Sequence, residues 1–263
     1  MESISKHLNG SWHKKSSEMS DKFLIAIISK DERFSTPAES HSRFVESHDG
    51  SVVERITNNK ENITVLGNRL MDRCVSEGFD FLVMMHSDVE VDLNGLSYHI
   101  CECKEKYDVM GLCGCEKISV SQSPLNWFCG SRPFPEFRWG CVCHGELGDS
   151  VSYFSISRPE IRDHAVSCID GLCMIFSSNA IKKGLRFDEN LRFNCYDTQI
   201  SLDAVMNFKL RVGCLVEREL KHFSVGKSIL TDDFLKDEIV LRKRFGFGIP
   251  PGSKLEKLLD NQK

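Results

Sequence analysis

The 263-residue sequence contains no apolar run long enough to cross a lipid bilayer. Its longest apolar runs, over residues 23–28 and 81–85, are far shorter than the ~20 residues that a spanning helix needs. The N-terminal segment is polar and lacks the apolar stretch that a secretory signal requires. A long basic run is also missing and the net charge is −4, so we expect no general nucleic-acid-binding surface.

Proline is scarce, with 7 residues, whereas cysteine is plentiful, with 12. Twelve cysteines without a secretory signal predict reduced thiols, and therefore a cytoplasmic protein. Half of them form C-x-C pairs: Cys101/Cys103, Cys113/Cys115 and Cys141/Cys143. Zinc sites usually use C-x₂₋₄-C pairs, and a C-x-C pair on a strand places both thiols on one face. We expect these thiols to pack in the core and the chain to fold without stoichiometric zinc.

The pattern of apolar residues predicts three regions. Residues 1–21 are polar and are expected to be a disordered tail, residues 22–228 the main domain, and residues 229–263 a C-terminal helical extension and tail. Within the domain, strands are expected over residues 23–28, 63–66, 79–85, 107–115, 168–176 and 214–216, and helices over residues 68–78, 95–106, 177–184 and 197–210. Residues 32–60 are expected to be helix and loop. This alternation predicts an α/β fold with a mostly parallel sheet.

Polar side chains directly after strands are the first candidates for chemistry, because ligands of such sheets bind beyond the carboxyl ends of the strands. Ser29 and Asp31 follow the first strand, and His86, Asp88 and Glu90 follow another. Carboxylate oxygens hold hard divalent cations such as Mg²⁺ or Mn²⁺, which neutralise a nucleotide diphosphate. The alternative is that these residues form an ordinary solvated turn.

Three further positions carry polar side chains in notable surroundings. Asp170 precedes Gly171 inside an apolar stretch, where a carboxylate needs a partner or a ligand. Asp197 lies where a helix is expected to begin, as an N-cap or as a general base. His222 lies in a Ser- and Gly-containing segment after the last strand, where it could ligate a metal or phosphate.

Taken in order, four segments resemble the family 2-like glycosyltransferases, which have a GT-A fold. They are the Asp-Gly strand over residues 168–176, the G-x-x-F-D-E turn over residues 184–189, the acidic helix start at residues 196–197, and the H-x-S-x-G loop over residues 222–226. His86-Ser-Asp-Val is similar to the H-x-D-V variant of that family's DXD motif. The resemblance spans about residues 22–228 and implies a mixed, mostly parallel sheet flanked by helices.

The resemblance implies transfer of a sugar from a nucleotide-diphosphate sugar, a UDP- or GDP-sugar, to a hydroxyl of a glycan or another acceptor, with inversion. Asp88 would contact Mn²⁺ or Mg²⁺ and the donor diphosphate, with His222 as a further ligand and His86 and Glu90 as additional metal candidates. Asp197 would be the catalytic base, and Ser29, Asp31 and Asp170 would lie at the donor. Trp127 and Trp139 would stack on the acceptor sugar, although a core role fits them equally.

Two other classes of protein fit the same residues. A nucleotidyltransferase on a similar α/β sheet would also use strand-end carboxylates and a metal, but it would release pyrophosphate or a nucleoside monophosphate. A non-catalytic nucleotide-binding or zinc-binding module would bind a ligand without turning it over.

Overall fold

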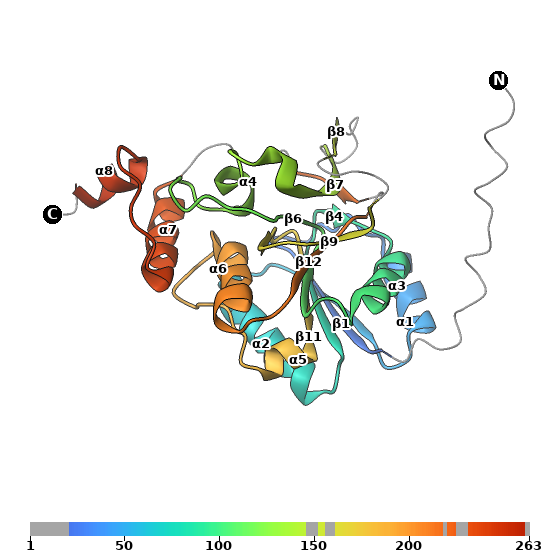
Figure 1. Cartoon of the computed structure of the whole chain (residues 1–263). Helices are drawn as coiled ribbons and strands as arrows, with labels where there is room; N and C mark the ends of the chain where they lie inside the picture. The colour runs from blue at the N-terminus through green and yellow to red at the C-terminus, as the bar shows by residue number, and fades with distance from the viewer. Residues whose placement is uncertain (1–20, 146–151, 156–160, 218–219, 225–230, 261–263) are drawn as a thin grey trace, which may run out of the picture.

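The computed structural model describes residues 21–145, 152–155, 161–217, 220–224 and 231–260 (Figure 1). The tail predicted over residues 1–21 lies outside these residues except for Asp21, and so do Val225 and Gly226 of the predicted H-x-S-x-G loop. Among the described residues, no helix is both long and apolar enough to cross a membrane.

A seven-stranded mixed sheet forms the centre of the molecule, in the order β2-β1-β3-β11-β5-β12-β9. Strands β2, β1, β3, β5 and β12 run in one direction, whereas β11 and β9 run in the other. The strands are β1 (Phe23–Ile28), β2 (Val52–Ile56), β3 (Phe81–His86), β5 (Val109–Gly111), β9 (Asp163–Ala165), β11 (Cys173–Ser177) and β12 (Val212–Leu215). The predicted α/β class and largely parallel sheet are confirmed.

A second, smaller sheet lies beyond the central one, in the order β10-β6-β7-β13-β4, with β8 paired to β7. Its strands are β4 (Val89–Glu90), β6 (Cys113–Cys115), β7 (Arg138–His144), β8 (Ser152–Ser155), β10 (Cys168–Ile169) and β13 (Lys221–His222). Because β4 follows β3 closely and β13 pairs with β4, this sheet brings His222 beside the end of β3.

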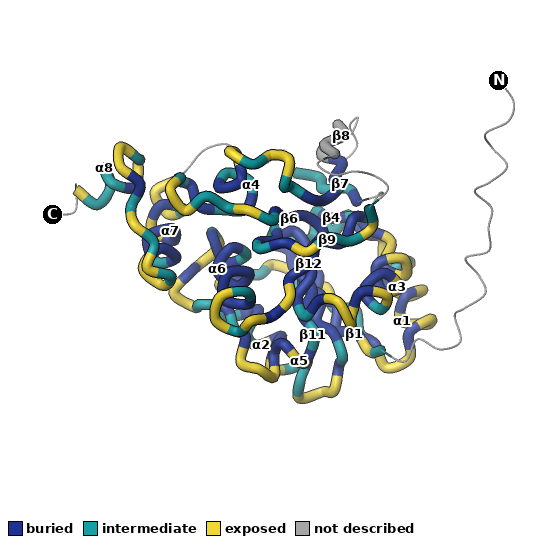
Figure 2. Tube along the Cα trace, in the orientation of Figure 1, coloured by how far each residue is buried: buried dark blue, intermediate teal, exposed yellow. Residues whose placement is uncertain are grey.

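Helices cover both faces of the central sheet, as Figure 1 shows. The alternating side chains of β1 explain this: Leu24 and Ala26 pack on one side with α2, α5 and α6, whereas Phe23 and Ile25 pack on the other with α1 and α3. The inner strands β1, β3, β5, β11 and β12 are largely dark in Figure 2 because both of their faces are covered. The helices are α1 (Ala38–Ser47), α2 (Ile63–Ser76), α3 (Leu93–Cys103), α4 (Trp127–Gly130), α5 (Ser178–Lys182), α6 (Tyr196–Leu202), α7 (Asp232–Phe245) and α8 (Lys254–Asp260), with a 3-10 turn at Pro135–Phe137 and a π turn at Asp203–Asn207.

Two elements differ from the sequence-based prediction. Residues 63–66, predicted as a strand, form the first turn of α2, where Ile63, Thr64 and Leu66 are buried against the sheet. Residues 52–56, predicted as part of a helix and loop, form the edge strand β2. In both segments, contacts with the rest of the fold override the local pattern.

The strands predicted over residues 107–115 and 168–176 are each divided in two. Strands β5 and β11 pair in the central sheet, whereas their neighbours β6 and β10 pair in the smaller one. The chain changes sheets at Leu112 and at the segment Asp170–Leu172, which lie side by side because the Asp170 amide donates to the Cys113 carbonyl at 2.8 Å. The change of sheet therefore positions Asp170 and Gly171 at the carboxyl end of β3.

Helix α7 is fixed to the domain through Arg242, whose side chain is fully buried. Its guanidinium donates to Glu238 Oε1 at 2.9 Å and to the carbonyls of Val120 at 2.8 Å, Gly248 at 2.7 Å and Gln122. The C-terminal extension is thereby joined to the segment that precedes α4.

We expect Arg242→Ala to lower the free energy of unfolding by about 3–5 kcal/mol, because Glu238 is left as an unpaired buried carboxylate. Chemical denaturation would measure this loss. Lys243→Ala, at the exposed neighbouring position, is the control and should change stability by about 0.5 kcal/mol or less. Equal effects of the two substitutions would contradict a clamping role for Arg242.

Candidate metal and catalytic site

The carboxyl ends of β1 and β3 form the floor of the site. The Ser87 amide donates to the Ile28 carbonyl at 3.0 Å, and the His86 amide donates to the Leu172 carbonyl at 2.9 Å. These bonds bring the residues after β1, the residues after β3 and the turn before β11 together. The residues after β1 and β3, which the sequence offered as candidates for chemistry, therefore lie close together here.

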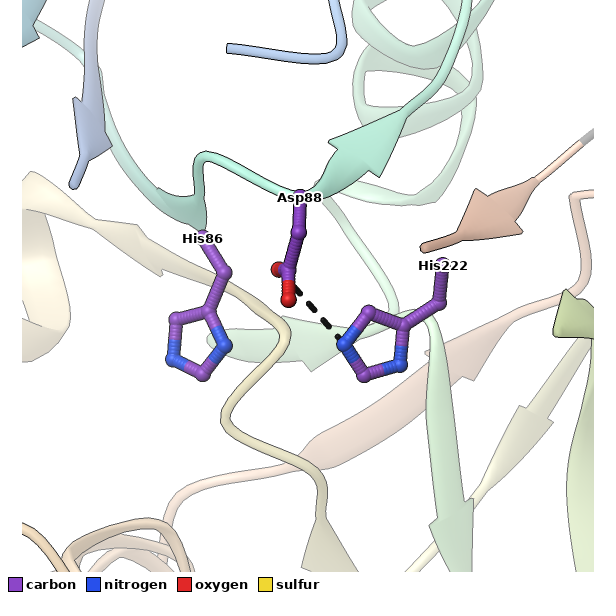
Figure 3. Close-up of side chains that lie close together, drawn as sticks. All are labelled: His86, Asp88 and His222. Atoms are coloured by element: carbon purple, nitrogen blue, oxygen red, sulfur yellow. Dashed lines mark ion pairs between the residues drawn. The ribbon is translucent and has the colours of Figure 1, made fainter. Parts of the chain in front are cut away.

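Three predicted metal ligands lie side by side: His86, Asp88 and His222 (Figure 3). One ligand atom of each lies within 4.8 Å of the others. His222 Nε2 is 3.5 Å from Asp88 Oδ1. That carboxylate oxygen is buried, and the His222 ring beside it supplies the positive charge that a bound cation could replace. The donor set of two imidazoles and one carboxylate fits a divalent transition metal.

Tyr196 fixes the orientation of the His86 ring. Burial, and then the negative charge of Asp197, raises the pKa of Tyr196 well above its ordinary value, so its hydroxyl is protonated and donates to the Gly171 carbonyl at 3.2 Å. The same hydroxyl lies 3.0 Å from His86 Nε2, which must then be the protonated nitrogen. Figure 3 shows the other ring nitrogen, Nδ1, on the side of Asp88 and His222. Its lone pair is thus available to a metal.

Gly171 makes this arrangement possible. A Cβ at this position would lie 2.2 Å from the Tyr196 hydroxyl oxygen, so any other residue would displace the tyrosine. The Asp-Gly pair singled out in the sequence therefore has a direct effect on the histidine ligand.

The charges of the three residues complement one another. Burial lowers the pKa of His86, which favours the neutral ring. Burial alone would lower the pKa of His222, but the hydrogen bond and charge of Asp88 outweigh it and the pKa is raised. Burial likewise opposes ionisation of Asp88, yet His222 holds the pKa of that carboxyl below its usual value. A divalent cation would take the place of the His222 proton, so its binding releases a proton.

Glu90, Ser29 and Asp31 are not part of this group. Glu90 pairs with Lys221 at 2.6 Å, and Ser29 donates to Asp31 Oδ1 at 3.0 Å. Asp31 also accepts from Arg33, whose hydrogen bonds lower the pKa of this carboxyl to about 2. Ser29 and Asp31 thus build the loop at the end of β1, next to the group.

Asp197 lies on the other side of the Asp-Gly turn, in the first turn of α6. It is not the N-cap, since that position belongs to Cys195, which has a left-handed backbone with φ of 59°. Instead, Asp197 Oδ2 accepts from the Gly171 amide at 3.2 Å, and Oδ1 accepts from the Thr198 amide at 2.7 Å. Burial, and then the nearby Asp170 carboxylate, raises the pKa of Asp197 to about 7. A carboxylate with that pKa can accept a proton near neutral pH.

Both tryptophans proposed to stack on an acceptor sugar are only 8% exposed. The Trp127 indole donates to Asp170 Oδ2, and the Trp139 indole donates to Glu116 Oε1 at 2.8 Å. Trp139 also stacks on His164, with ring centroids 3.7 Å apart. In this structure both rings serve packing and orientation, which is the alternative that the sequence left open for them.

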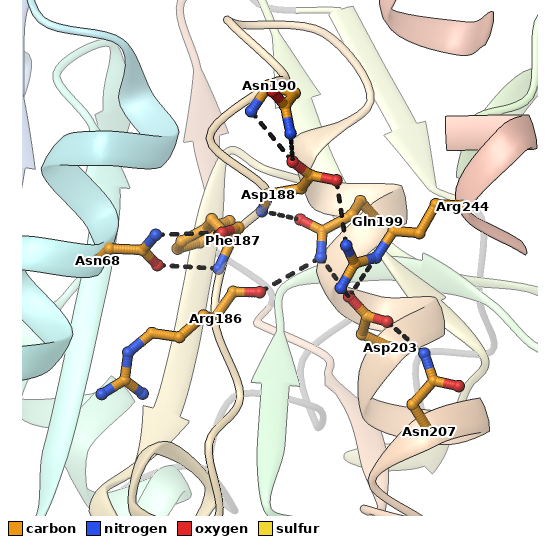
Figure 4. A network of polar contacts seen from close by, with 9 residues as sticks. All are labelled: Asn68, Arg186, Phe187, Asp188, Asn190, Gln199, Asp203, Asn207 and Arg244. Atoms are coloured by element: carbon orange, nitrogen blue, oxygen red, sulfur yellow. Dashed lines mark hydrogen bonds and ion pairs between the residues drawn. The ribbon is translucent and has the colours of Figure 1, made fainter. Parts of the chain in front are cut away.

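Both acids of the G-x-x-F-D-E turn form polar contacts, and Figure 4 shows those of Asp188. Asp188 Oδ2 pairs with Arg244 of α7 at 3.1 Å, and Asp203 pairs with the same guanidinium at 2.7 Å. Glu189 accepts from Asn68 Nδ2 at 2.9 Å. These contacts join α2, the π turn after α6, and α7, so Asp188 and Glu189 are held by structural partners.

The structure adds two side chains that the sequence did not single out. Phe193 is 45% exposed and its ring stacks at 6.3 Å on that of His86. Lys30 lies with its ammonium 3.9 Å from the centre of the Phe193 ring. Lys30 could have been found because it lies between Ser29 and Asp31 at a strand end. No local pattern indicates a role for Phe193, because its partner His86 is more than a hundred residues away in the sequence.

No protein-family model and no curated protein matches this chain. Many solved structures are similar to it in part, among them the following three. A197 from STIV has 16% identity over 77% of this chain and 86% of its own, with a TM-score of 0.39. GalNAc-T7, crystallised with UDP, GalNAc and Mn²⁺, has 10% identity over 86% of this chain but only 48% of its own, with a TM-score of 0.46.

A third structure is described as a nucleotide-diphospho-sugar transferase from Desulfovibrio desulfuricans G20. It has 11% identity over 92% of this chain and 73% of its own, with a TM-score of 0.31. All three TM-scores lie below 0.5, so the activity of this chain must be inferred from its own side chains.

Proposed function

We propose that this protein is a metal-dependent glycosyltransferase of the GT-A type, similar to family 2, which inverts the anomeric carbon of a nucleotide-diphosphate sugar. The single observation that carries the proposal is the meeting of His86, Asp88 and His222, with Asp197, a carboxylate whose pKa is raised to about 7, held across the turn at Gly171. One group is suited to a cation and the other to accepting a proton, and transfer to a hydroxyl needs both.

The divalent ion would be held by His86 Nδ1, Asp88 and His222 Nε2. A set with two imidazoles favours Mn²⁺ over Mg²⁺, which prefers oxygen ligands. When bound, the ion would supply positive charge to the diphosphate leaving group. Lys30 would add a further positive charge, and the exposed Phe193 ring would offer a flat apolar face to the donor.

Asp197 would act on the acceptor. Its carboxylate would take the proton of the acceptor hydroxyl while the hydroxyl oxygen bonds to the anomeric carbon. The bond from that carbon to the phosphate oxygen breaks, and its electron pair leaves with the nucleoside diphosphate. Because Asp197 is held by the Gly171 amide, which belongs to the same turn as Asp170, the base would be fixed relative to the metal ligands.

The test is a screen of UDP- and GDP-sugars with and without Mn²⁺, in which free nucleotide products are identified. We expect one donor to release nucleoside diphosphate only when Mn²⁺ is present. Release of pyrophosphate from a nucleoside triphosphate with a sugar phosphate would instead establish a nucleotidyltransferase. Metal-dependent binding of nucleotide without turnover in any acceptor mixture would point to a binding module.

A further inference from the structure

A second group of potential metal ligands lies on the far side of the sheet from α2, away from the candidate catalytic site. His99 and Cys103 are one helical turn apart on α3, and Asp163 faces them from the edge strand β9. One ligand atom of each residue lies within 4.8 Å of the others. Together with Glu102, Lys106 and Arg162, these residues line a cavity of about 270 Å³.

His99 is the observation that points to a ligand. Its side chain is only 4% exposed, and its Nδ1 lies 2.6 Å from Glu217 Oε1. The other nitrogen, Nε2, is buried and has no hydrogen-bond partner among the described residues. A buried nitrogen without a hydrogen-bond partner destabilises the fold, and a bound ligand would relieve that cost. With its Nδ1 proton donated to a carboxylate, an imidazole presents the Nε2 lone pair in the orientation common among metal-bound histidines.

The other two donors are complementary to that nitrogen. Cys103 is 1% exposed, so its sulfur is shielded from solvent. Asp163 accepts from the Tyr107 hydroxyl at 2.9 Å and from Lys106 at 2.9 Å, so its carboxylate is ionised and held in place. The Lys106 side chain is 55% exposed and can turn to solvent when a cation arrives.

We propose that His99, Cys103 and Asp163 form a zinc site, with Glu217 orienting the histidine and the cavity leaving room for water as a fourth ligand. One nitrogen, one sulfur and one carboxylate oxygen are ligands that Zn²⁺ accepts, whereas Mg²⁺ and Ca²⁺ do not bind thiols. Thiolate and carboxylate together balance the charge of the ion. The site would tie α3 to the edge strand β9 and to the segment that follows β12.

This zinc site differs from the C-x-C sites that the sequence left open. All twelve cysteines lie in the described residues and are free thiols, and Cys113, Cys115 and Cys143 are buried in the core. Cys101 and Cys103 lie on a helix, where i and i+2 side chains point apart, so only Cys103 faces the cavity. Because the ligands are already held by the fold, we expect the protein to stay folded when the metal is removed.

The test titrates metal-free protein with Co²⁺, which substitutes for Zn²⁺ and absorbs in the near ultraviolet when a thiolate binds it. We expect a thiolate band whose full amplitude corresponds to one thiolate-bound Co²⁺ per chain and which disappears when Zn²⁺ is added. Cys103→Ser should abolish the band. His222→Ala is the matched control: it removes a ligand of the candidate catalytic group, which contains no cysteine, and should retain the band. Absence of the band in the natural protein, or its persistence in Cys103→Ser, would overturn the proposal.

Glu217→Gln supplies a second readout that spares every ligand. The side chain keeps its size but loses the charge that orients His99, so Co²⁺ affinity should fall by about 10- to 100-fold. Unchanged affinity would also overturn the proposal, even if Cys103→Ser proved unable to fold. Since none of these residues belongs to the candidate catalytic group, the outcome is independent of whether the protein transfers sugars.

Discussion

Asp197→Asn is expected to lower the rate of sugar transfer by about 10²–10⁴-fold, the usual cost of losing a general base. Binding of the nucleotide-sugar should stay close to that of the natural protein. The asparagine side-chain oxygen can still accept from the Gly171 or Thr198 amide, as Asp197 does at 3.2 and 2.7 Å. The substitution therefore removes the ability to take a proton while it keeps the geometry of the turn. Transfer rate and donor affinity, measured on the same preparation, test this.

The dependence on pH gives the same variant a second signature. Burial, and then the charge of Asp170, raises the pKa of Asp197 to about 7. A general base works only when it is deprotonated, so Asp197 becomes active as the pH rises through that value. The rate of the natural protein should fall as the pH drops below about 7, and Asp197→Asn should lack this limb.

Stability should depend on pH with the opposite sign. In the unfolded chain the Asp197 carboxyl has a pKa of about 4. Between about pH 4 and pH 7 the folded protein therefore binds more protons than the unfolded chain, and its stability falls as the pH rises. Above that range Asp197 is charged in both states, and its charge destabilises the fold. Asp197→Asn should therefore raise the melting temperature more at pH 8 than at pH 4.

Near-normal transfer with an unchanged pH profile would refute the assignment of Asp197 as the base, and Asp170 would be the next candidate. Loss of donor affinity together with transfer would place Asp197 among the donor-binding residues instead.

The sequence predicted the strands that are buried on both faces. Residues 23–28 and 81–85 form continuous apolar runs followed by polar residues, and no helical period fits them. Strand β2 was missed because its residues are mostly half-buried at a sheet edge, where a charged pair such as Glu54 and Arg55 is tolerated. The first turn of α2 was mistaken for a strand because β-branched residues open it and pack against the sheet. Local pattern cannot resolve either case, since both depend on neighbours distant in sequence.

The candidate site was predictable where a residue follows a strand. His86, Asp88 and His222 could all be named on that ground, and the resemblance to a family of glycosyltransferases added the metal role that it implies for Asp88 and His222. The roles of Tyr196 and Phe193 depend on contacts with His86, which is about 110 residues away, so only the folded chain reveals them. Conversely, Trp127 and Trp139 looked suited to sugar stacking, but both rings are buried and their indole N–H groups donate to the carboxylates of Asp170 and Glu116.

Asp88→Asn should abolish the metal-dependent part of nucleotide binding. The amide keeps the size of the side chain but removes the only carboxylate of the group. Loss of a residue that merely orients a metal ligand lowers metal affinity by about 10–100-fold. Because Asp88 would bind the metal directly, the affinity for Mn²⁺ should fall by more than that. In the natural protein, UDP or GDP at 100 times its dissociation constant with Mn²⁺ should stabilise the fold by about 2.7 kcal/mol. For a chain of this length that corresponds to a melting-temperature rise of about 5–10 °C.

Glu90→Gln is the matched control for Asp88→Asn, because Glu90 lies two residues away but pairs with Lys221 on the partly exposed surface. Breaking that pair should cost about 1 kcal/mol or less and leave the Mn²⁺-dependent shift intact. Thermal melts of the three proteins, each with nucleotide alone, Mn²⁺ alone and both together, separate metal binding from nucleotide binding. A full shift in Asp88→Asn would remove Asp88 from the site. In this structure the pairing of β4 with β13 directs Glu90 to Lys221. Loss of the Mn²⁺-dependent rise in melting temperature in Glu90→Gln would therefore mean that these two strands rearrange to bring Glu90 to the metal.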